Sequence, residues 1–196
     1  MFEAAVLGVS AGGLHATTTI IAALPATFPL PIAIVQHVGA QSDAYLVEHL
    51  NRFSALKVKE AEDKEIISPG IVYVAPAGYH LLIEPDRSFS LSVDDKVNFS
   101  RPSIDLLFES AANAFGDALI GIVLTGANSD GAQGLQTIKR CGGLAVVQNP
   151  DTAEAPYMPR AALAATAVDH ILDLERIALL LRKLCNGGSG GTRMEG

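Results

Sequence analysis

The stretch Ala4-Ala5-Val6-Leu7-Gly8-Val9-Ser10-Ala11-Gly12-Gly13 joins an apolar run to a turn of small residues. An apolar run of this length, interrupted only by glycine, predicts a buried β-strand. The next segment, residues 14–24, is predicted to be a helix, and Pro25 ends it. A buried strand that passes through a tight turn into a helix is typical of a parallel α/β sheet.

The same alternation returns along most of the chain. Buried strands are also predicted at residues 31–35, 118–124, 144–147 and 171–172. Helices are predicted at residues 42–53, 103–115, 131–140 and 174–184, and an alanine-rich helix is predicted after an irregular loop at residues 150–159. Ser42 and Ser103 are suited to cap the helices that they open. The alternation predicts an α/β fold with a mostly parallel sheet and helices on both faces.

The middle of the chain has a different pattern. Residues 56–59 and 88–93 alternate between polar and apolar side chains, and residues 71–74 form a β-branched and aromatic run. Turn residues such as Ser68-Pro69-Gly70 separate these segments. The pattern predicts antiparallel hairpins with one face exposed to water. We expect their strands to join the sheet and make it mixed.

The composition bounds the class of protein. The chain has 196 residues, of which 49% are hydrophobic and 18% charged, and its formal net charge is −7. A chain of this kind buries a core and is not intrinsically disordered. Acidic character without a Lys/Arg cluster argues against nucleic acid or an anionic membrane as a partner. We expect one domain at residues 1–185, followed by a glycine-rich, disordered tail at residues 186–196.

The cysteines and the hydrophobic runs indicate where the protein works. Cys141 and Cys185 form no C-x-x-C pair, which argues against a zinc site and favours reduced thiols. No apolar run reaches the ~18 residues of a membrane span. The N-terminus lacks the basic segment of a secretion signal. We therefore expect a cytoplasmic protein that does not insert into membranes.

Reactive side chains follow three of the predicted strands. Ser10 follows the first strand, His37 the second, and Asp130 the loop after residues 118–124. Sites in open α/β sheets gather at the carboxyl ends of the strands, so these side chains are expected at one edge. Gly8-x-Ser10-x-Gly12 also fits the nucleophile-elbow pattern, in which a sharp turn exposes a serine hydroxyl. His37 could act as the base for Ser10, and Asp130 could hold the histidine tautomer.

Other interpretations of these residues stay open. Gly8-x-Ser10-x-x-Gly13 is also a degenerate dinucleotide-binding pattern, but Gln36-His37 stands where that pattern needs an acidic residue. Asp130 could simply cap the helix that follows it, which is the commoner role of such an aspartate. The order Ser, His, Asp differs from the Ser, Asp, His order of the α/β-hydrolases and disfavours that fold.

Several segments together resemble the catalytic domain of the CheB protein-glutamate methylesterases. The resemblance covers residues 4–184. It is carried by Gly8-Val9-Ser10-Ala11-Gly12-Gly13, Gln36-His37, residues 74–80, Arg101-Pro102-Ser103-Ile104-Asp105, residues 124–131, Gln148-Asn149 and Met158-Pro159-Arg160. One segment alone would be weak, but all of them in this order and spacing are specific.

The resemblance implies a fold, an activity and a site. Family members have a doubly wound α/β fold with an antiparallel hairpin. They hydrolyse methyl esters of glutamate side chains on the cytoplasmic helices of chemoreceptors, deamidate certain receptor glutamines, and use no metal or organic cofactor. The nucleophile, base and orienting acid fall on Ser10, His37 and Asp130. The backbone N–H groups of Ala11 and Ala127 are candidate oxyanion donors.

Departures from the family pattern concern the pocket. Ala11 stands where many members have threonine, and Ala127-Asn128 and Val38-Gly39 stand where many have Met-Gly and Met-Pro. Backbone donors survive these changes, so they bear on substrate choice rather than on the chemistry. Residues that could contact an acidic receptor helix are Arg101, Arg160 and His80.

The resemblance also leaves alternatives. The first predicted strand begins at Ala4, which leaves no room for the N-terminal receiver domain of well-known members. Either the chain is a stand-alone esterase or it was cut from a longer one; a stand-alone enzyme should not respond to a phosphodonor. The chain could instead be an esterase or amidase for another protein or a small ester. It could also be a catalytically inactive module that binds receptors.

Overall fold

A computed structural model describes residues 1–37 and 43–186. Within them, seven strands form one parallel sheet in the order β3-β4-β2-β1-β7-β8-β9. The strands are β1 (Ala4–Val9), β2 (Ile32–Gln36), β3 (Lys57–Glu60), β4 (Ile71–Val74), β7 (Leu119–Val123), β8 (Leu144–Gln148) and β9 (His170–Leu172). The predicted cap Ser42, the pair Val38-Gly39 and tail residues 187–196 lie outside the described residues.

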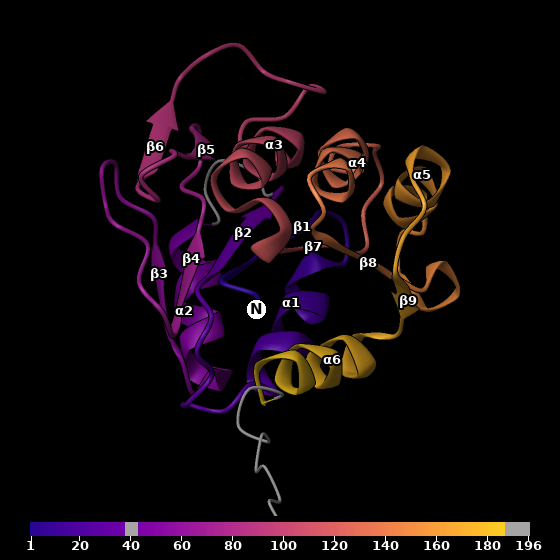
Figure 1. Ribbon diagram of the computed structural model, residues 1–196, viewed down its shortest axis with the longest axis horizontal. Helices are drawn as coiled ribbons and strands as arrows, with labels where there is room; N and C mark the ends of the chain where they lie inside the picture. The colour runs from indigo at the N-terminus through magenta and orange to yellow at the C-terminus, as the bar shows by residue number, and fades with distance from the viewer. Residues whose placement is uncertain (38–42, 187–196) are drawn as a thin grey trace, which may run out of the picture.

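Helices cover both faces of this sheet, as predicted (Figure 1). They are α1 (Gly13–Ala22), α2 (Asp43–Phe53), α3 (Ile104–Phe115), α4 (Ala132–Arg140), α5 (Tyr157–Ala165) and α6 (Leu174–Asn186), with short 3-10 turns at Gly116–Ala118 and Pro150–Thr152. The predicted loop at residues 150–159 is too long, because α5 begins at Tyr157 and contains Pro159 in its first turn. Proline is tolerated there because the first N–H groups of a helix lack intrahelical acceptors.

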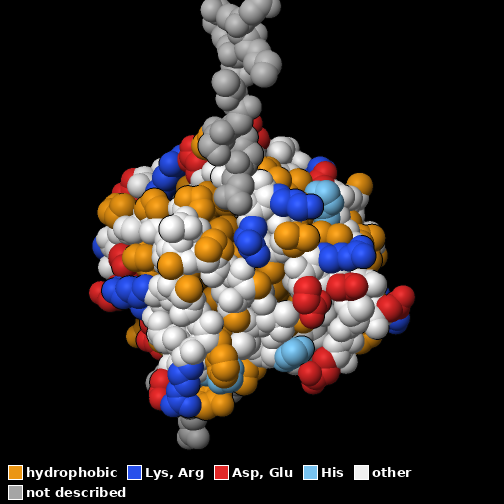
Figure 2. Space-filling model, turned by 90° about the horizontal axis from the view of Figure 1, so that it is seen from below, with side chains coloured by type: hydrophobic (Ala, Val, Ile, Leu, Met, Phe, Trp, Pro, Cys, Tyr) orange, Lys and Arg blue, Asp and Glu red, His pale blue; other side chains and the backbone are white. Residues whose placement is uncertain are grey.

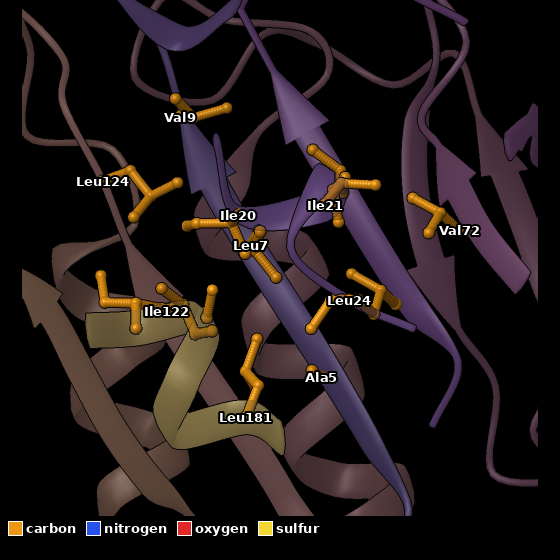
Figure 3. Packing of buried hydrophobic residues seen from close by; sticks show 14 of the residues in the cluster. Ala5, Leu7, Val9, Ile20, Ile21, Leu24, Val72, Ile122, Leu124 and Leu181 are labelled. Atoms are coloured by element: carbon orange, nitrogen blue, oxygen red, sulfur yellow. The ribbon is translucent and has the colours of Figure 1, made fainter. Parts of the chain in front are cut away.

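Alternation along the central strands builds two separate cores. Ala5, Leu7 and Val9 of β1 point to one face, where they pack with residues of α1, α2 and α6 (Figure 3). Ala4 and Val6 point to the other face, toward α3, α4 and α5. Successive side chains of a strand face opposite sides, so one fully buried strand serves both cores.

The winding of the sheet reverses at β1. The chain leaves β1 toward β2 and β4 on one side and returns to place β7, β8 and β9 on the other. In such sheets the crevice that holds a site lies at the carboxyl ends of the strands beside the reversal. Val9 pairs with Gln36 in the parallel register, so β1 and β2 end at the same level of this edge.

The strands in the middle of the chain pair differently from the expected hairpins. β3 and β4 pair parallel to each other within the large sheet, although residues 56–59 and 71–74 predicted antiparallel partners. The antiparallel hairpin is β5 (His80–Ile83) with β6 (Phe89–Ser92), which forms a separate two-stranded sheet. The large sheet is therefore parallel rather than mixed.

The connection between β3 and β4 explains this difference. It pairs along the hairpin edge: Lys64 N–H donates to Phe89 O, Phe89 N–H donates to Glu65 O, and Ile67 N–H donates to Arg87 O. The connection thus makes its backbone hydrogen bonds with residues 20 to 25 positions away instead of folding back on itself. Local alternation does not reveal a partner that distant.

Candidate active site

Ser10 and His37 leave neighbouring strands side by side. Ser10 directly follows β1 and His37 directly follows β2. His37 N–H donates to Val9 O at 2.9 Å, and Ser10 N–H donates to Thr125 O at 3.0 Å, so β1, β2 and the loop after β7 are tied together at this edge. Gly12 follows with φ 76°, a left-handed conformation that glycine adopts without strain and that turns the chain into α1.

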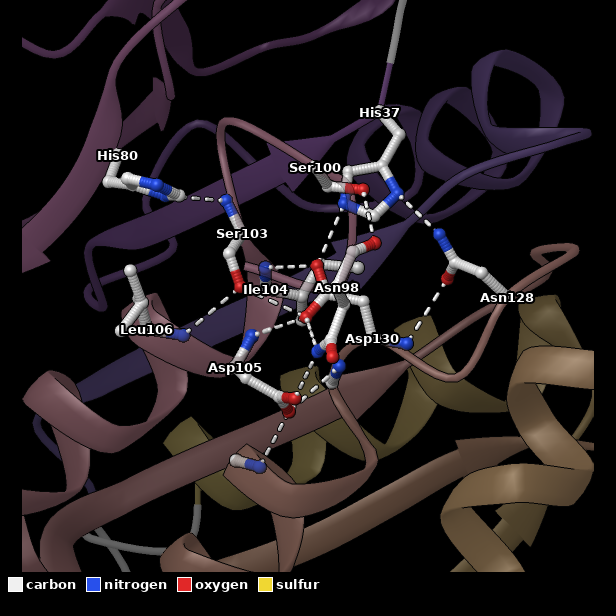
Figure 4. A network of polar contacts seen from close by, with 12 residues as sticks. His37, His80, Asn98, Ser100, Ser103, Ile104, Asp105, Leu106, Asn128 and Asp130 are labelled. Atoms are coloured by element: carbon white, nitrogen blue, oxygen red, sulfur yellow. Dashed lines mark hydrogen bonds and ion pairs between the residues drawn. The ribbon is translucent and has the colours of Figure 1, made fainter. Parts of the chain in front are cut away.

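His37 and Asp130 form a direct pair (Figure 4). Nε2 of His37 lies 2.9 Å from Oδ2 of Asp130, and the two side chains are 13% and 0% exposed. Burial raises the pKa of Asp130, but hydrogen bonds from His37 and from the N–H groups of Ile104 and Asp105 outweigh it and hold that pKa below its ordinary value. Asp130 is therefore an ionised acceptor at neutral pH.

Asp130 also caps a helix, but not the one that follows it. Its carboxylate accepts from the N–H of Ile104 at 2.7 Å and of Asp105 at 3.1 Å, and from Ser103 Oγ at 3.0 Å, all at the start of α3. The helix after it, α4, has Gly131 as its N-cap and receives no side-chain cap from that residue. The expectation that Asp130 could cap the following helix is wrong in its choice of helix, because packing brings the start of α3 closer.

Asp105, in the first turn of α3, caps the start of α4 in turn. Its Oδ1 accepts from the N–H of Gly131 at 2.9 Å and of Gly134 at 2.7 Å, at the start of α4. Burial is the largest cause that raises the pKa of Asp105, and the charge of Asp130 raises it further, against the lowering effect of the N–H donors. We call this exchange between Asp105 and Asp130 the reciprocal cap.

Asn98 joins the two carboxylates of the reciprocal cap. Its Nδ2 donates to Oδ2 of Asp105 at 2.8 Å and to Oδ1 of Asp130 at 3.1 Å. One amide thus lies between two negative groups that would otherwise repel. Sequence reasoning missed Asn98, which has no motif around it. It gave Asp105 no role, although Asp105 ends one of the segments that carried the resemblance.

The loop after β7 is bound to the nucleophile turn and to the segment before α5. Thr125 Oγ1 donates to Ala11 O at 2.8 Å and accepts from Ala155 N–H at 2.8 Å. Within the described residues, the N–H groups of Ala11 and Ala127 donate to no acceptor of the chain. Both N–H groups therefore lack an acceptor among the described residues, and their role as oxyanion donors stays a prediction.

Asn128 in this loop contacts the histidine as well. Its Nδ2 lies 3.2 Å from Nδ1 of His37, and its Oδ1 accepts from Asp130 N–H at 3.1 Å. The sequence marked Asn128 only as a departure from the family pattern. No local pattern indicates this contact, because it joins residues 91 positions apart.

The weaker candidates have different surroundings. His80 is fully buried: Nδ1 accepts from Ser103 N–H and Nε2 lies 3.0 Å from Asp95 O. His80 was expected to contact substrate, but its buried ring instead accepts a hydrogen bond from the residue that precedes α3. Arg101 donates from Nη1 to the carbonyls of Val93 and Asp94, so its side chain stabilises the loop that precedes α3. Arg160 is exposed on α5 and remains a candidate.

The surface and the side-chain clusters bear on other functions. On the face shown in Figure 2, positive and negative side chains are interspersed with apolar ones, without a continuous basic patch. In residues 1–37 and 43–186, no three His, Cys, Asp or Glu side chains gather as metal ligands would. Among the same residues, no helix has both the length and the apolar character needed to cross a membrane.

Fold and site define a class: a doubly wound α/β protein with serine, histidine and aspartate at the carboxyl edge of its sheet. The family model for CheB methylesterase matches residues 5–181. The chain belongs to the CheB methylesterase family.

Individual relatives agree with this family assignment. A Leptospira interrogans protein with the provisional name protein-glutamate methylesterase/protein-glutamine glutaminase is 58% identical over 183 residues, which cover 93% of this chain and 95% of the relative. A Carboxydothermus hydrogenoformans protein of the same name is 42% identical and covers 88% of this chain, but only 52% of the relative is matched. The crystal structure of the Thermotoga maritima CheB methylesterase catalytic domain matches with a TM-score of 0.90 and 34% identity, over 94% of this chain and 99% of that one.

Proposed function

We propose that this chain hydrolyses methyl esters of glutamate side chains, with Ser10 as nucleophile, His37 as base and Asp130 as orienting acid. The observation that carries the proposal is the His37–Asp130 pair at 2.9 Å, with Asp130 fully buried, at the end of the strand next to Ser10. An ionised, fully buried carboxylate on one ring nitrogen fixes the tautomer and leaves the other nitrogen to accept a proton. The names of the relatives support the choice of ester.

The proposed reaction is acyl transfer in two halves. Ser10 Oγ bonds to the ester carbonyl carbon and its proton passes to His37, while the carbonyl oxygen becomes an oxyanion held by the N–H groups of Ala11 and Ala127. The C–O bond to methoxide then breaks, and His37 protonates methoxide to methanol. Water attacks the acyl-serine, gives its proton to His37, and releases glutamate as Ser10 regains the proton.

The same site would deamidate glutamine side chains. The acyl-serine intermediate is identical, and the leaving group protonated by His37 is ammonia instead of methanol. The names of the relatives include a protein-glutamine glutaminase activity, which supports this second reaction.

The proposal also covers the substrate protein, the cellular compartment and the bounds of the catalytic domain. The substrate would be the methylated cytoplasmic helices of a chemoreceptor, in the cytoplasm, and Arg160 is the exposed cation proposed to meet their carboxylates. Residues 1–185 would form the catalytic domain, of which residues 5–181 match the family model. The His80 side chain is left out of the substrate surface because it is buried.

The deciding experiment measures methanol released from receptor membranes whose glutamates carry radiolabelled methyl esters. The parent protein and a Ser129→Ala control should release methanol, and Ser10→Ala should release none. Ser129 is an exposed neighbour of the site without a proposed role. Release by Ser10→Ala at the parent rate would overturn the assignment of the nucleophile. No release by the parent, with turnover of small esters, would point to another substrate.

A further inference from the structure

The ring of His37 lies between two side chains of the same loop (Figure 4). Nε2 is 2.9 Å from Asp130 Oδ2, and Nδ1 is 3.2 Å from Asn128 Nδ2. Both ring nitrogens thus already have a partner in the resting protein. The partner on Nδ1 is the unexpected one, because a catalytic base needs one nitrogen open to its nucleophile.

The contacts around Asn128 determine how its amide is turned. Asp130 N–H faces Asn128 Oδ1 at 3.1 Å, and a backbone N–H can only donate. The oxygen of the amide must therefore face Asp130, which leaves the NH₂ group facing His37. This orientation follows from the hydrogen-bonding chemistry and does not depend on distinguishing nitrogen from oxygen by their positions.

The same reasoning fixes the tautomer of His37. An amide NH₂ only donates, so Nδ1 must present a lone pair to Asn128. The Asp130 carboxylate only accepts, so Nε2 must carry the proton. Both contacts give one tautomer, in which Nδ1 is the nitrogen left to take the proton of Ser10.

Asn128 and Ser10 therefore compete for one lone pair. Within the described residues, Ser10 Oγ makes no hydrogen bond to His37, whereas Asn128 does. Once Nδ1 is protonated it would face the NH₂ group, and two donors cannot share a hydrogen bond. The amide cannot turn its oxygen toward the ring without giving up its bond from Asp130 N–H.

We propose that Asn128 is a positioning residue that covers Nδ1 of His37 in the resting enzyme and that Ser10 displaces it before acyl transfer. The inference rests on the proposed function of Ser10 and His37. The loop leaves room for the displacement, because Asn128 is only partly buried and its neighbours Ala127 and Ser129 are exposed. Asn128 thus restrains the base until a substrate occupies the site.

The first test measures how fast a fluorophosphonate labels Ser10. In this reaction the Ser10 Oγ–P bond forms, fluoride leaves, and the Oγ proton passes to Nδ1. Asn128→Ala removes the competing donor and should react about 2- to 10-fold faster, the worth of one neutral hydrogen bond. Asn128→Asp has nearly the same shape but can only accept, so it favours a proton on Nδ1 and should react more slowly than the parent. Ser129→Ala is the control and should match the parent.

The second test measures which ring nitrogen of His37 carries the proton, by ¹⁵N NMR of labelled His37. The parent should show a protonated Nε2 and an unprotonated, hydrogen-bonded Nδ1. Asn128→Ala should keep this tautomer while the Nδ1 signal moves to that of a free lone pair. Ser129→Ala should leave both signals in place.

The outcomes separate this inference from the proposed function. Faster labelling of Asn128→Ala, slower labelling of Asn128→Asp and the shifted Nδ1 signal would support the restraint. Slower labelling of both variants, or a parent protonated on Nδ1, would overturn it and leave the nucleophile intact. A parent that the fluorophosphonate does not label at Ser10 would overturn the proposed function together with the displacement step.

Discussion

Asp130 accepts five hydrogen bonds with two oxygens. The donors are His37 Nε2, the N–H groups of Ile104 and Asp105, Ser103 Oγ and Asn98 Nδ2. A buried carboxylate with this many donors is stabilised in its ionised form despite its desolvation. The orientation of the proposed base and the start of α3 therefore depend on one charged group.

This arrangement predicts an acid-sensitive contribution to stability. The pKa of Asp130 is lowered from 3.8, with burial opposing the hydrogen bonds that lower it. The native state therefore binds its proton less readily than the unfolded state does, so the contribution is complete above the unfolded value and is lost as pH falls through the folded one. Asp105, whose pKa is raised, has the opposite sign.

The check compares the free energy of unfolding of the parent with that of Asp130→Asn. Urea titrations from pH 7 down to pH 3 should show a difference that is constant near neutrality and shrinks below about pH 4, the ordinary range of an aspartate. A difference that stays constant down to pH 3 would mean that Asp130 is not stabilised as a carboxylate.

Residues differ in how far the sequence reveals them. Ser10, His37 and Asp130 were predicted to lie together because each follows a strand, and the structure brings His37 and Asp130 into contact at the edge where Ser10 lies. Asn98 and Asn128 escaped prediction. Each contributes a single amide contact across the fold, and such contacts leave no periodicity or spacing in the sequence.

At the scale of elements, the reciprocal cap joins α3 to α4. A helix begins with N–H groups that lack intrahelical partners. Here α4 receives an acceptor from the first turn of α3, and α3 receives one from Asp130, the residue before the N-cap of α4. The two helices are therefore fixed at their starts, which lie beside the site, and not only along their packed sides.

Removing one half of the cap should destabilise the fold measurably. Asp105→Ala leaves the buried N–H groups of Gly131 and Gly134 without their acceptor, at a cost of about 2–4 kcal/mol. Urea unfolding measures this loss. Glu109→Ala, on the same helix, is the matched control and should stay within about 0.5 kcal/mol of the parent. Equal effects of the two changes would contradict the reciprocal cap.

Close packing of α3 on β1 depends on Gly8. A Cβ at Gly8 would collide with Cγ2 of Ile104, the first residue of α3. Gly8→Ala should therefore cost about 1–3 kcal/mol by overpacking. In an Ile104→Ala background the same change should cost less, because the obstructing side chain is gone.

A double-mutant cycle measures this coupling as a difference in the free energy of unfolding, expected at about 0.5–3 kcal/mol. Ile177→Ala provides the comparison, since Ile177 packs in the core on the other face of the sheet. Gly8→Ala should be additive with it. Additivity with Ile104→Ala as well would show that the glycine is not required by that contact.

The elements also show where prediction from sequence fails. The predicted strands and helices of the α/β alternation agree with the observed ones to within a residue or two, except α5, which begins at Tyr157 inside the loop predicted at residues 150–159. The strands could be located because burial on both faces gives continuous apolar runs. β3 was misjudged because an edge strand with one exposed face alternates in the same way whether its partner runs parallel or antiparallel.

At the scale of the whole molecule, stability should decrease from the centre of the sheet to its edges. Every residue of β1, β2 and β7 is buried, whereas β9 has no buried residue and β3 has one. Backbone hydrogen bonds covered by packing on both sides open only in large unfolding events. Native-state hydrogen exchange should therefore be slowest in β1 and β7 and faster by orders of magnitude in β9. Uniform protection across the sheet would contradict this gradient.

The double duty of Asp130 has a consequence for the evolutionary decay of such genes. In a copy released from selection for activity, a change of the Ser10 side chain would cost the proposed chemistry alone, while a change at Asp130 also removes the N-terminal acceptor of α3. Selection for a soluble, folded product would therefore preserve the aspartate after the serine is gone. Among inactive descendants an intact aspartate would record a surviving fold, and the serine would be the residue that tells a working enzyme from a relic.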